Sequence, residues 1–233
     1  IVLYKILISK HGIMNHLELF SGTHSFGKVS TLRGNNVVSL DKYMDKSSSD
    51  SDYISKTHIC KDILTWDYKV YPTGYFSVIW ASPPCVSFST MGGGKHRLKS
   101  NMTPKTEIGV EGDLCLIKVF EIIDYFKPPV YFIENPRGLM RYSQTIIDRN
   151  CFINECSYCK YGFPYMKNTD IFSNKKIKLQ KCFYKRKNII NNCHHAAVSG
   201  SHKNRIMAGV KRTSRCDAYK VPAKLINELL QSI

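Results

Sequence analysis

The chain has 233 residues, of which 43% are hydrophobic and 22% charged, a composition typical of one globular domain with a buried core. No apolar stretch approaches the roughly 18 residues that cross a bilayer, which argues against a membrane protein and a membrane partner. With 34 Lys and Arg against 18 Asp and Glu, the formal net charge is +16, which favours a polyanionic partner such as nucleic acid.

The positive charge is concentrated in the last third of the chain. From Lys160 to Ile233 there are 16 Lys and Arg residues against 3 Asp and Glu. Clustering of this kind is typical of a surface that contacts nucleic-acid phosphates, and we favour that interpretation. The alternative is a solvated basic face that serves solubility.

Short apolar runs alternate with helical spacing over the first 135 residues. Apolar side chains three positions apart predict a helix that ends at Gly34, and a second helix is expected over 113–126 with Asp113 as its N-cap. The predicted strands are residues 17–20, 37–40, 60–64, 76–81 and 130–133. This β-α-β-α order predicts an α/β fold with a mostly parallel, doubly wound sheet.

The remaining segments carry weaker patterns. Residues 1–13 are expected to be a peripheral extension, and the Ser- and Asp-rich residues 42–58 a loop. Residues 91–112 are rich in Gly, Lys and Thr, which predicts a long mobile loop of the kind that closes over a ligand. Near the C-terminus, a helix is expected over 222–230, with proline in its first turn.

Ser82-Pro83-Pro84-Cys85 follows the apolar run that ends at Ala81. Two prolines stiffen the loop, and the carboxyl end of a strand is where open α/β sheets place reacting groups. Cys85 is therefore a candidate nucleophile, although unreactive buried cysteines are common.

Small and acidic residues follow three other predicted strands. The turn at Ser21-Gly22 joins the first strand to a helix, so its backbone N–H groups can receive a ligand. Asp41 ends the next strand, where an acidic residue binds ribose hydroxyls in nucleotide-type cofactor sites. Asp62 can accept a hydrogen bond from an adenine amino group. Taken singly, Gly22 is only a turn residue and Asp41 only an acidic residue in a loop. Together with Asp62, they predict that a cofactor binds along this edge of the sheet.

Glu134-Asn135-Pro136-Arg137 follows the fifth predicted strand. In isolation the segment could simply end a strand. Next to a loop that carries Cys85, however, a carboxyl group can give or take a proton.

Together, these motifs resemble the cytosine-C5 DNA methyltransferase family, strongly over residues 17–140 and faintly after 150. The resemblance implies a Rossmann-like fold with an S-adenosylmethionine-binding catalytic domain over 14–150. Residues 151–233 would form a basic region that completes the sheet and contacts DNA. The implied cofactor-binding residues are Phe20, Ser21, Gly22, Thr23, Phe26, Asp41, Lys42, Asp62, Ile63, Pro83 and Leu114.

The resemblance also implies the chemistry. Cys85 would attack C6 of a flipped-out cytosine while Glu134 holds a proton at ring N3. The methyl group would pass from S-adenosylmethionine to C5, and elimination would release Cys85. The implied DNA-binding residues are Ser87, Lys95, Arg97, Asn135, Arg137, Lys160 and Lys167.

The chain departs from the family pattern in several places. His24 stands where a second glycine is usual and would crowd the cofactor. The Gln-x-Arg-x-Arg element has no clear copy, so Lys160 and Lys167 would replace its polar pair. The segment 221–224 would replace the closing Gly-Asn-Ala-Val. The target-recognition region is reduced to about 175–215, which leaves room for a helper protein.

Two alternatives to DNA methylation stay open. The departures are compatible with an impaired protein that keeps the fold and binds nucleic acid, and the same chemistry would serve RNA cytosine. The small size and the Lys-, Asn- and Ile-rich composition fit a phage or large-virus gene.

The nine cysteines are odd in number and irregularly spaced, which predicts a reduced, intracellular protein of the cytoplasm or nucleus. Cys156 and Cys159 have zinc-ligand spacing, with Cys182 and Cys193-His194-His195 as further candidates. These last residues form no regular pair, so we favour free thiols and expect no metal.

Overall fold

The computed structural model describes residues 12–43, 57–90, 93–98, 100–182, 197–198 and 219–233. Most of the predicted extension at 1–13 and of the predicted loop at 42–58 lies outside these residues. So does most of the stretch expected to hold the reduced target-recognition region. Among the described helices, none has the length and apolar character needed to traverse a bilayer.

The main structural element is a sheet of seven strands in the order β3-β2-β1-β4-β5-β8-β6. Its first five strands are parallel neighbours, whereas β8 runs antiparallel to both β5 and β6. The bounds are β1 Asn15–Leu19, β2 Asn36–Asp41, β3 His58–Cys60, β4 Val78–Ala81, β5 Val130–Pro136, β6 Phe152–Ser157 and β8 Asn168–Ser173. This arrangement confirms the predicted mostly parallel α/β sheet. A small parallel pair joins β7 Tyr165–Met166 to β9 Ala197–Val198.

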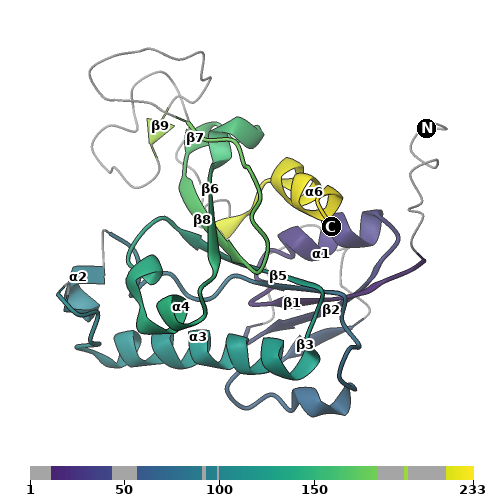
Figure 1. The fold of residues 1–233 in the computed structure, drawn as a ribbon, viewed down its shortest axis with the longest axis horizontal. Coiled ribbons are helices and arrows are strands. Elements are labelled where there is room, and N and C mark those ends of the chain that lie inside the picture. Colours follow the sequence, from purple (N-terminus) through teal and green to yellow (C-terminus); the bar gives the residue numbers. More distant parts are fainter. Residues whose placement is uncertain (1–11, 44–56, 91–92, 99, 183–196, 199–218) are drawn as a thin grey trace.

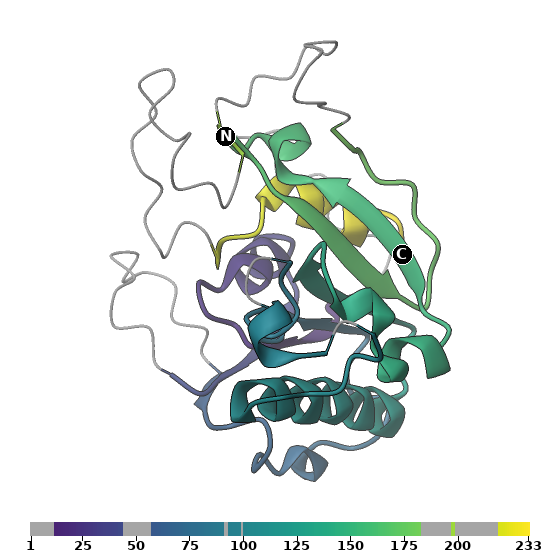
Figure 2. The same cartoon turned by 90° about the vertical axis from the view of Figure 1, so that its left-hand side faces the viewer.

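Helices cover both faces of the sheet (Figures 1 and 2). The long helix α3, Glu107–Phe126, lies along one face, and α1, Ser25–Leu32, packs with α6, Ala223–Gln231, on the other. The shorter helices are η2 Tyr68–Val70, α2 Gly93–His96, η3 Met140–Tyr142, α4 Gln144–Asp148 and η4 Tyr158–Tyr161.

The alternation of side chains along each strand builds two cores. In β4, Ile79 points into the core under α3, while Trp80 points into the core shared with α1 and α6. Both faces are covered, and β4 is accordingly buried at every position. A strand that is buried on both faces has a continuous run of apolar residues, and such runs predicted these strands from the sequence.

Among the predicted elements, two differ most from the structure at their bounds. The third strand is His58–Cys60 rather than 60–64, because Asp62 turns the chain by accepting from the Leu64 N–H at 3.0 Å. Helix α3 begins at Glu107 rather than at Asp113, with Thr106 as its N-cap.

Two glycines made the start of α3 look like a loop in the sequence. Both are needed for close packing: a Cβ on Gly109 would lie 2.6 Å from the His96 carbonyl oxygen, and one on Gly112 would lie 2.4 Å from Ser87 Oγ. Glycine is unfavourable inside a helix, but here it lets the helix approach the neighbouring chain.

The described part of residues 91–112 is not the long mobile loop that was predicted. Its anchor is Arg97, which is 1% exposed and forms a 2.7 Å ion pair with Asp113. The guanidinium also donates to the carbonyl oxygens of Ser87, Met102 and Gly109 and lies 4.0 Å from the centre of the Phe88 ring. A buried arginine with this many partners holds the segment in place.

Candidate active site

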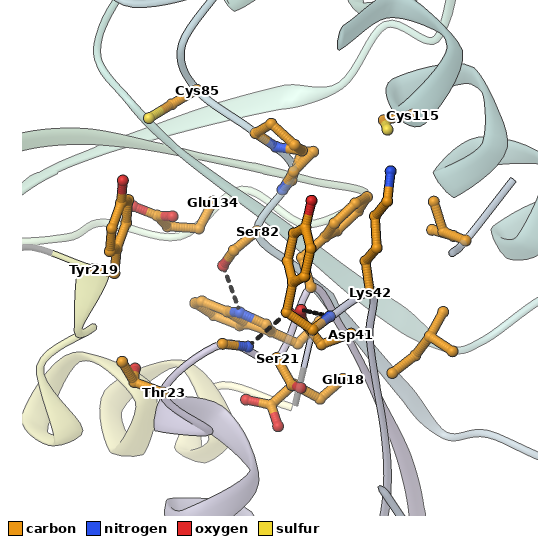
Figure 3. A pocket seen from close by; sticks show the side chains of 18 of the residues that line it. Glu18, Ser21, Thr23, Asp41, Lys42, Ser82, Cys85, Cys115, Glu134 and Tyr219 are labelled. Atoms are coloured by element: carbon orange, nitrogen blue, oxygen red, sulfur yellow. Dashed lines mark hydrogen bonds between the residues drawn. The ribbon is translucent and has the colours of Figure 1, made fainter. Parts of the chain in front are cut away.

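A cavity of about 410 Å³ opens at the carboxyl ends of β1, β2, β4 and β5. The strand order reverses between β1 and β4, and open α/β sheets bind ligands at such a switch point. Figure 3 shows Cys85, Glu134 and Tyr219 toward one end of the cavity, with Asp41, Lys42 and Cys115 toward the other.

The turn between β1 and α1 forms one wall of the cavity. Gly22 has φ +43°, a left-handed conformation that glycine adopts without strain, and its N–H donates to Asp41 Oδ2 at 2.9 Å. The Ser21 N–H donates to the Leu40 carbonyl oxygen at 3.0 Å, which ties the turn to β2. The turn and the end of β2 therefore form one unit.

Glu18 fixes the direction of α1 below this turn. It is 2% exposed, and its Oε1 accepts from the N–H groups of Phe26 and Gly27, each at 3.0 Å. Its Oε2 accepts from Ser39 Oγ at 2.9 Å. A carboxylate at a helix N-terminus offsets the dipole and the unpaired N–H groups. This role of Glu18 was not predicted from the sequence.

Three charged side chains, those of Lys42, Asp62 and Glu111, lie together at the end of the cavity away from Cys85 (Figure 3). Lys42 Nζ is 3.0 Å from Asp62 Oδ2 and 3.8 Å from Glu111 Oε1. Hydrogen bonding to Asp62 raises the pKa of Lys42, and the Leu64 N–H, followed by Lys42, lowers the pKa of Asp62. The Asp62 carboxylate is thus negative at neutral pH and can accept from an amino group.

The loop that carries Cys85 is held from three sides. Ser82 donates its N–H to the Leu19 carbonyl oxygen at 3.2 Å, and the Phe88 and Ser89 N–H groups donate to the Cys85 carbonyl oxygen. Asn135 Nδ2 donates to the Pro83 carbonyl oxygen at 3.1 Å. Burial, reinforced by the charge of Glu134, raises the pKa of the half-buried Cys85 thiol.

Glu134 is almost fully buried, with 6% exposed, and lines the same cavity as Cys85. Its Oε1 accepts from the hydroxyl of Tyr158 at 2.7 Å and lies 3.6 Å from Lys167 Nζ. Lys167 also lies 4.8 Å from the centre of the Tyr158 ring. The carboxylate is therefore held from η4 and from the segment before β8, both in the basic C-terminal part of the chain.

Most of the predicted cofactor residues line this cavity. They are Phe20, Ser21, Gly22, Thr23, Asp41, Lys42, Asp62, Ile63 and Pro83. Phe26 and Leu114 do not, and these two assignments are corrected. The Phe26 ring is buried against Trp80 at 5.3 Å, and Leu114 is 47% exposed, because α3 turns Glu111 and Cys115 toward the cavity instead.

His24 does not crowd the cavity, contrary to the prediction. It is absent from the lining, and its ring lies 3.6 Å from Glu18 Oε2 and 5.1 Å from the His58 ring. With φ +53°, His24 adopts the left-handed conformation that the usual glycine would adopt freely.

Three predicted DNA-binding residues are buried and are corrected here. Ser87 and Asn135 are each 1% exposed, as is Arg97, and all three make internal hydrogen bonds. They position the Cys85 loop and the segment that precedes α3. None of them presents a side chain to a nucleic acid in this structure.

The other predicted DNA-binding residues are distributed differently. Lys167 lines the cavity, whereas Lys95 is exposed on α2 and Lys160 lies in η4 outside the lining. Arg137 is 36% exposed at its side chain, and its Nη2 lies 3.2 Å from Glu155 Oε2. Lys160 and Lys167 therefore do not act as a pair at Glu134.

The segment before α6 contributes cavity residues, which fits the expectation that 221–224 replaces the family's closing motif. Val221 lines the cavity, and its N–H donates to Ser25 Oγ at 3.0 Å. Tyr219, 61% exposed, also lines the cavity and was not singled out in the sequence. Tyr158 was missed as well, since its partner is 24 positions away.

The zinc hypothesis finds no support among the described residues. Cys156, Cys159 and Cys182 are buried, and no group of three or more His, Cys, Asp or Glu side chains in the described part could hold a metal ion. Cys193, His194 and His195 lie outside the described residues.

Comparison with solved structures supports the fold class. The Entamoeba histolytica methyltransferase EhMeth matches with a TM-score of 0.50 and 19% identity, over 75% of this chain and 58% of that one. The S. pombe Dnmt2 methyltransferase matches with a TM-score of 0.48 and 17% identity, over 72% and 52%. The chain thus spans about half the length of these structures. Its fold is that of a Rossmann-like α/β methyltransferase.

Sequence comparisons identify the family. The sequence model of the C-5 cytosine-specific DNA methylase family matches residues 14–205 of this chain. A probable DNA (cytosine-5)-methyltransferase of Frog virus 3 (isolate Goorha) is 31% identical over 230 residues, 93% of this chain and 99% of that protein. The chain belongs to the C-5 cytosine-specific DNA methylase family, as the motifs had predicted.

Proposed function

We propose that this protein transfers a methyl group from S-adenosylmethionine to C5 of a cytosine in DNA through a covalent intermediate on Cys85. The observation that carries the proposal is that Cys85 and Glu134 line one cavity, whose walls also include the turn at Gly22 and the end of β2. A nucleophile, a carboxyl group and a cofactor edge in one cavity are what this reaction needs.

The residues at the cofactor end fit S-adenosylmethionine. Asp41 and Asp62 provide carboxylate acceptors suited to ribose hydroxyls and an adenine amino group, and Ile63 adds an apolar contact. Gly22 has a left-handed backbone conformation and no side chain, so a cofactor in the cavity can approach its main chain closely. When bound, the cofactor supplies an electrophilic methyl group. Phe20, Ser21, Thr23, Lys42 and Pro83 complete the proposed cofactor-binding set.

Cys85 serves as the nucleophile in this proposal. Its sulfur bonds to C6 of the cytosine, and C5 then becomes electron-rich enough to accept a methyl group. Loss of the C5 proton and cleavage of the bond from sulfur to C6 restore the free thiol. Because burial raises the pKa of Cys85, the thiol is protonated in the resting protein and must lose its proton for attack.

Glu134 serves at the other side of the base. A carboxyl group that shares a proton with ring N3 stabilises the charge that develops when sulfur adds to C6. The near-complete burial of Glu134 strengthens this interaction, since few water molecules compete with the base.

The proposed substrate is double-stranded DNA with the target cytosine flipped out of the helix, because a base inside the duplex cannot reach a buried carboxylate. The basic C-terminal part and exposed lysines such as Lys95 would contact phosphates. A helper protein for target recognition remains part of the proposal. None of the described cysteines forms a disulfide, which fits an intracellular protein.

Incorporation of radiolabelled methyl groups from S-adenosylmethionine into duplex DNA tests this function. We expect transfer by the wild type, with at least about a thousandfold loss in Cys85→Ser and a large loss in Glu134→Gln. A parallel assay on tRNA distinguishes an RNA enzyme, and DNA binding without transfer to either substrate would favour the impaired protein.

A further inference from the structure

The two oxygens of Glu134 have different surroundings. Oε1 accepts the Tyr158 hydroxyl at 2.7 Å and has Lys167 Nζ at 3.6 Å. Among the residues that the structure describes, none donates a hydrogen bond to Oε2. Glu134 lines the cavity in which Cys85 also lies, so the oxygen without a protein donor is the one available to a ligand (Figure 3).

This difference determines where a proton on Glu134 resides. A hydroxyl donor and a nearby ammonium group both stabilise negative charge on Oε1. The carboxyl proton is therefore favoured on Oε2, which is the atom that has to share it with the base. The donor also fixes the rotation of the carboxylate, because only one orientation keeps the bond to Tyr158.

We propose that Tyr158 is a positioning residue that holds Glu134 through Oε1 and thereby directs Oε2 toward the substrate base. The inference rests on the proposed function of Cys85 and Glu134. It concerns a residue to which the sequence motifs assigned no role, on an element that the sequence pattern did not predict.

The surroundings of Tyr158 support a specific role for its hydroxyl. The side chain is fully buried, and its ring packs edge-on against Phe163 at 5.5 Å. A phenylalanine would pack equally well, whereas a buried hydroxyl is costly unless it is hydrogen-bonded. The Tyr158 N–H donates to the Lys167 carbonyl oxygen at 3.0 Å, so the two residues at Oε1 are tied together through the backbone. Burial holds the pKa of Tyr158 well above its usual value, which keeps the hydroxyl a donor.

Tyr158→Phe tests the proposal with Tyr161→Phe as a matched control. Tyr161 is a second buried tyrosine of η4, and its hydroxyl donates to Glu228 at 3.2 Å, outside the cavity lining. The assays are methyl transfer to duplex DNA and the rate of covalent complex formation with 5-fluorocytosine DNA. For Tyr158→Phe we expect about a 10- to 100-fold loss in kcat, with the KM for S-adenosylmethionine unchanged. The split between a reduced kcat and an unchanged KM is a readout that a general loss of folding would not give.

A double-mutant cycle separates positioning from an effect on folding. In the Glu134→Gln background, Tyr158→Phe should cause little further loss of complex formation, since both changes act at one carboxyl group. An equal loss in both backgrounds, or unchanged kcat in Tyr158→Phe, would overturn the positioning role while methylation by the wild type stands. If the wild type forms no complex and transfers no methyl group, the proposed function itself is wrong.

Discussion

The two halves of the site are built in different ways. From β1 to β5, the site residues lie near or just after the carboxyl ends of parallel strands, so the sheet itself brings Gly22, Asp41 and Cys85 to one edge. The C-terminal part contributes Tyr158 and Lys167 through η4 and the chain that leads into the antiparallel β8. The first half keeps the family motifs, whereas the second replaces the Gln-x-Arg-x-Arg element with other residue types.

This contrast shows which requirements are strict. In the proposed mechanism, attack on C6 needs a thiol at one position, so the loop with Cys85 should permit little change. Holding a carboxylate needs only a donor and a positive charge at the correct place, which a tyrosine and a lysine supply together here.

The largest expected effect lies in the strict half. Cys85→Ser should reduce methyl transfer by at least about a thousandfold, because a hydroxyl is a far weaker nucleophile at neutral pH. The matched control is Cys151→Ser, whose thiol lies 3.3 Å from the Tyr131 hydroxyl and does not line the cavity. Equal activity of the two variants, measured by radiolabel incorporation, would remove Cys85 from the mechanism.

Arg97→Met should destabilise the protein without acting at the cavity. It removes the ion pair with Asp113, whose side chain is 29% exposed, and the donors to the Met102 and Gly109 carbonyl oxygens, and losing these hydrogen bonds should cost about 1–3 kcal/mol. Urea unfolding gives the change in free energy of unfolding. A variant with wild-type stability and weakened DNA binding would restore the original assignment of Arg97 as a DNA contact.

Lys167 and Lys160 provide a sharper comparison within the C-terminal half. Lys167→Met should lower kcat by about tenfold, because it removes the positive charge 3.6 Å from Glu134 Oε1. Lys160→Met should leave kcat unchanged, since Lys160 lies outside the cavity lining. Steady-state kinetics on duplex DNA measure both, and equal losses would mean that the two lysines do act as a pair.

The smallest effect concerns the pH dependence of Cys85. A raised pKa means that the thiolate fraction at any given pH is lower than for a free thiol, so alkylation by iodoacetamide should be slow at pH 7. The rate should still be rising above pH 9, by contrast with a peptide of the same sequence. Mass spectrometry of Cys85 follows the reaction, and full-rate alkylation at pH 7 would show an activated thiolate instead.

The placement of the proposed cofactor residues and of the Cys85 loop could be predicted because it depends on the backbone. Parallel strands end at one edge, so Gly22, Asp41, Asp62 and Cys85 had to lie close together once the strands were assigned. The bounds of β3 and α3 were harder to predict from the sequence. The end of β3 depends on the turn at Asp62. At the start of α3, Gly109 and Gly112 resemble loop residues until their close contacts are known.

The remaining differences arise from side-chain directions and distant partners. Leu114 and Cys115 are neighbours in the sequence, but only the helix orientation shows that Cys115 faces the cavity. Lysine and arginine are most often exposed, so the burial of Arg97 could not be foreseen. Tyr158 reaches Glu134 only because β8 lies between β5 and β6, a pairing that the weak pattern after residue 137 did not reveal.

The most direct test is incubation with duplex DNA that contains 5-fluorocytosine, in the presence of S-adenosylmethionine. Fluorine cannot leave C5 as a cation, so the sulfur bond to C6 should persist, and we predict a denaturation-resistant complex that peptide mapping assigns to Cys85. The complex should form far more slowly in Glu134→Gln and not at all in Cys85→Ser. Methyl transfer to ordinary DNA without any such complex, or a complex that survives in Cys85→Ser, would contradict the account.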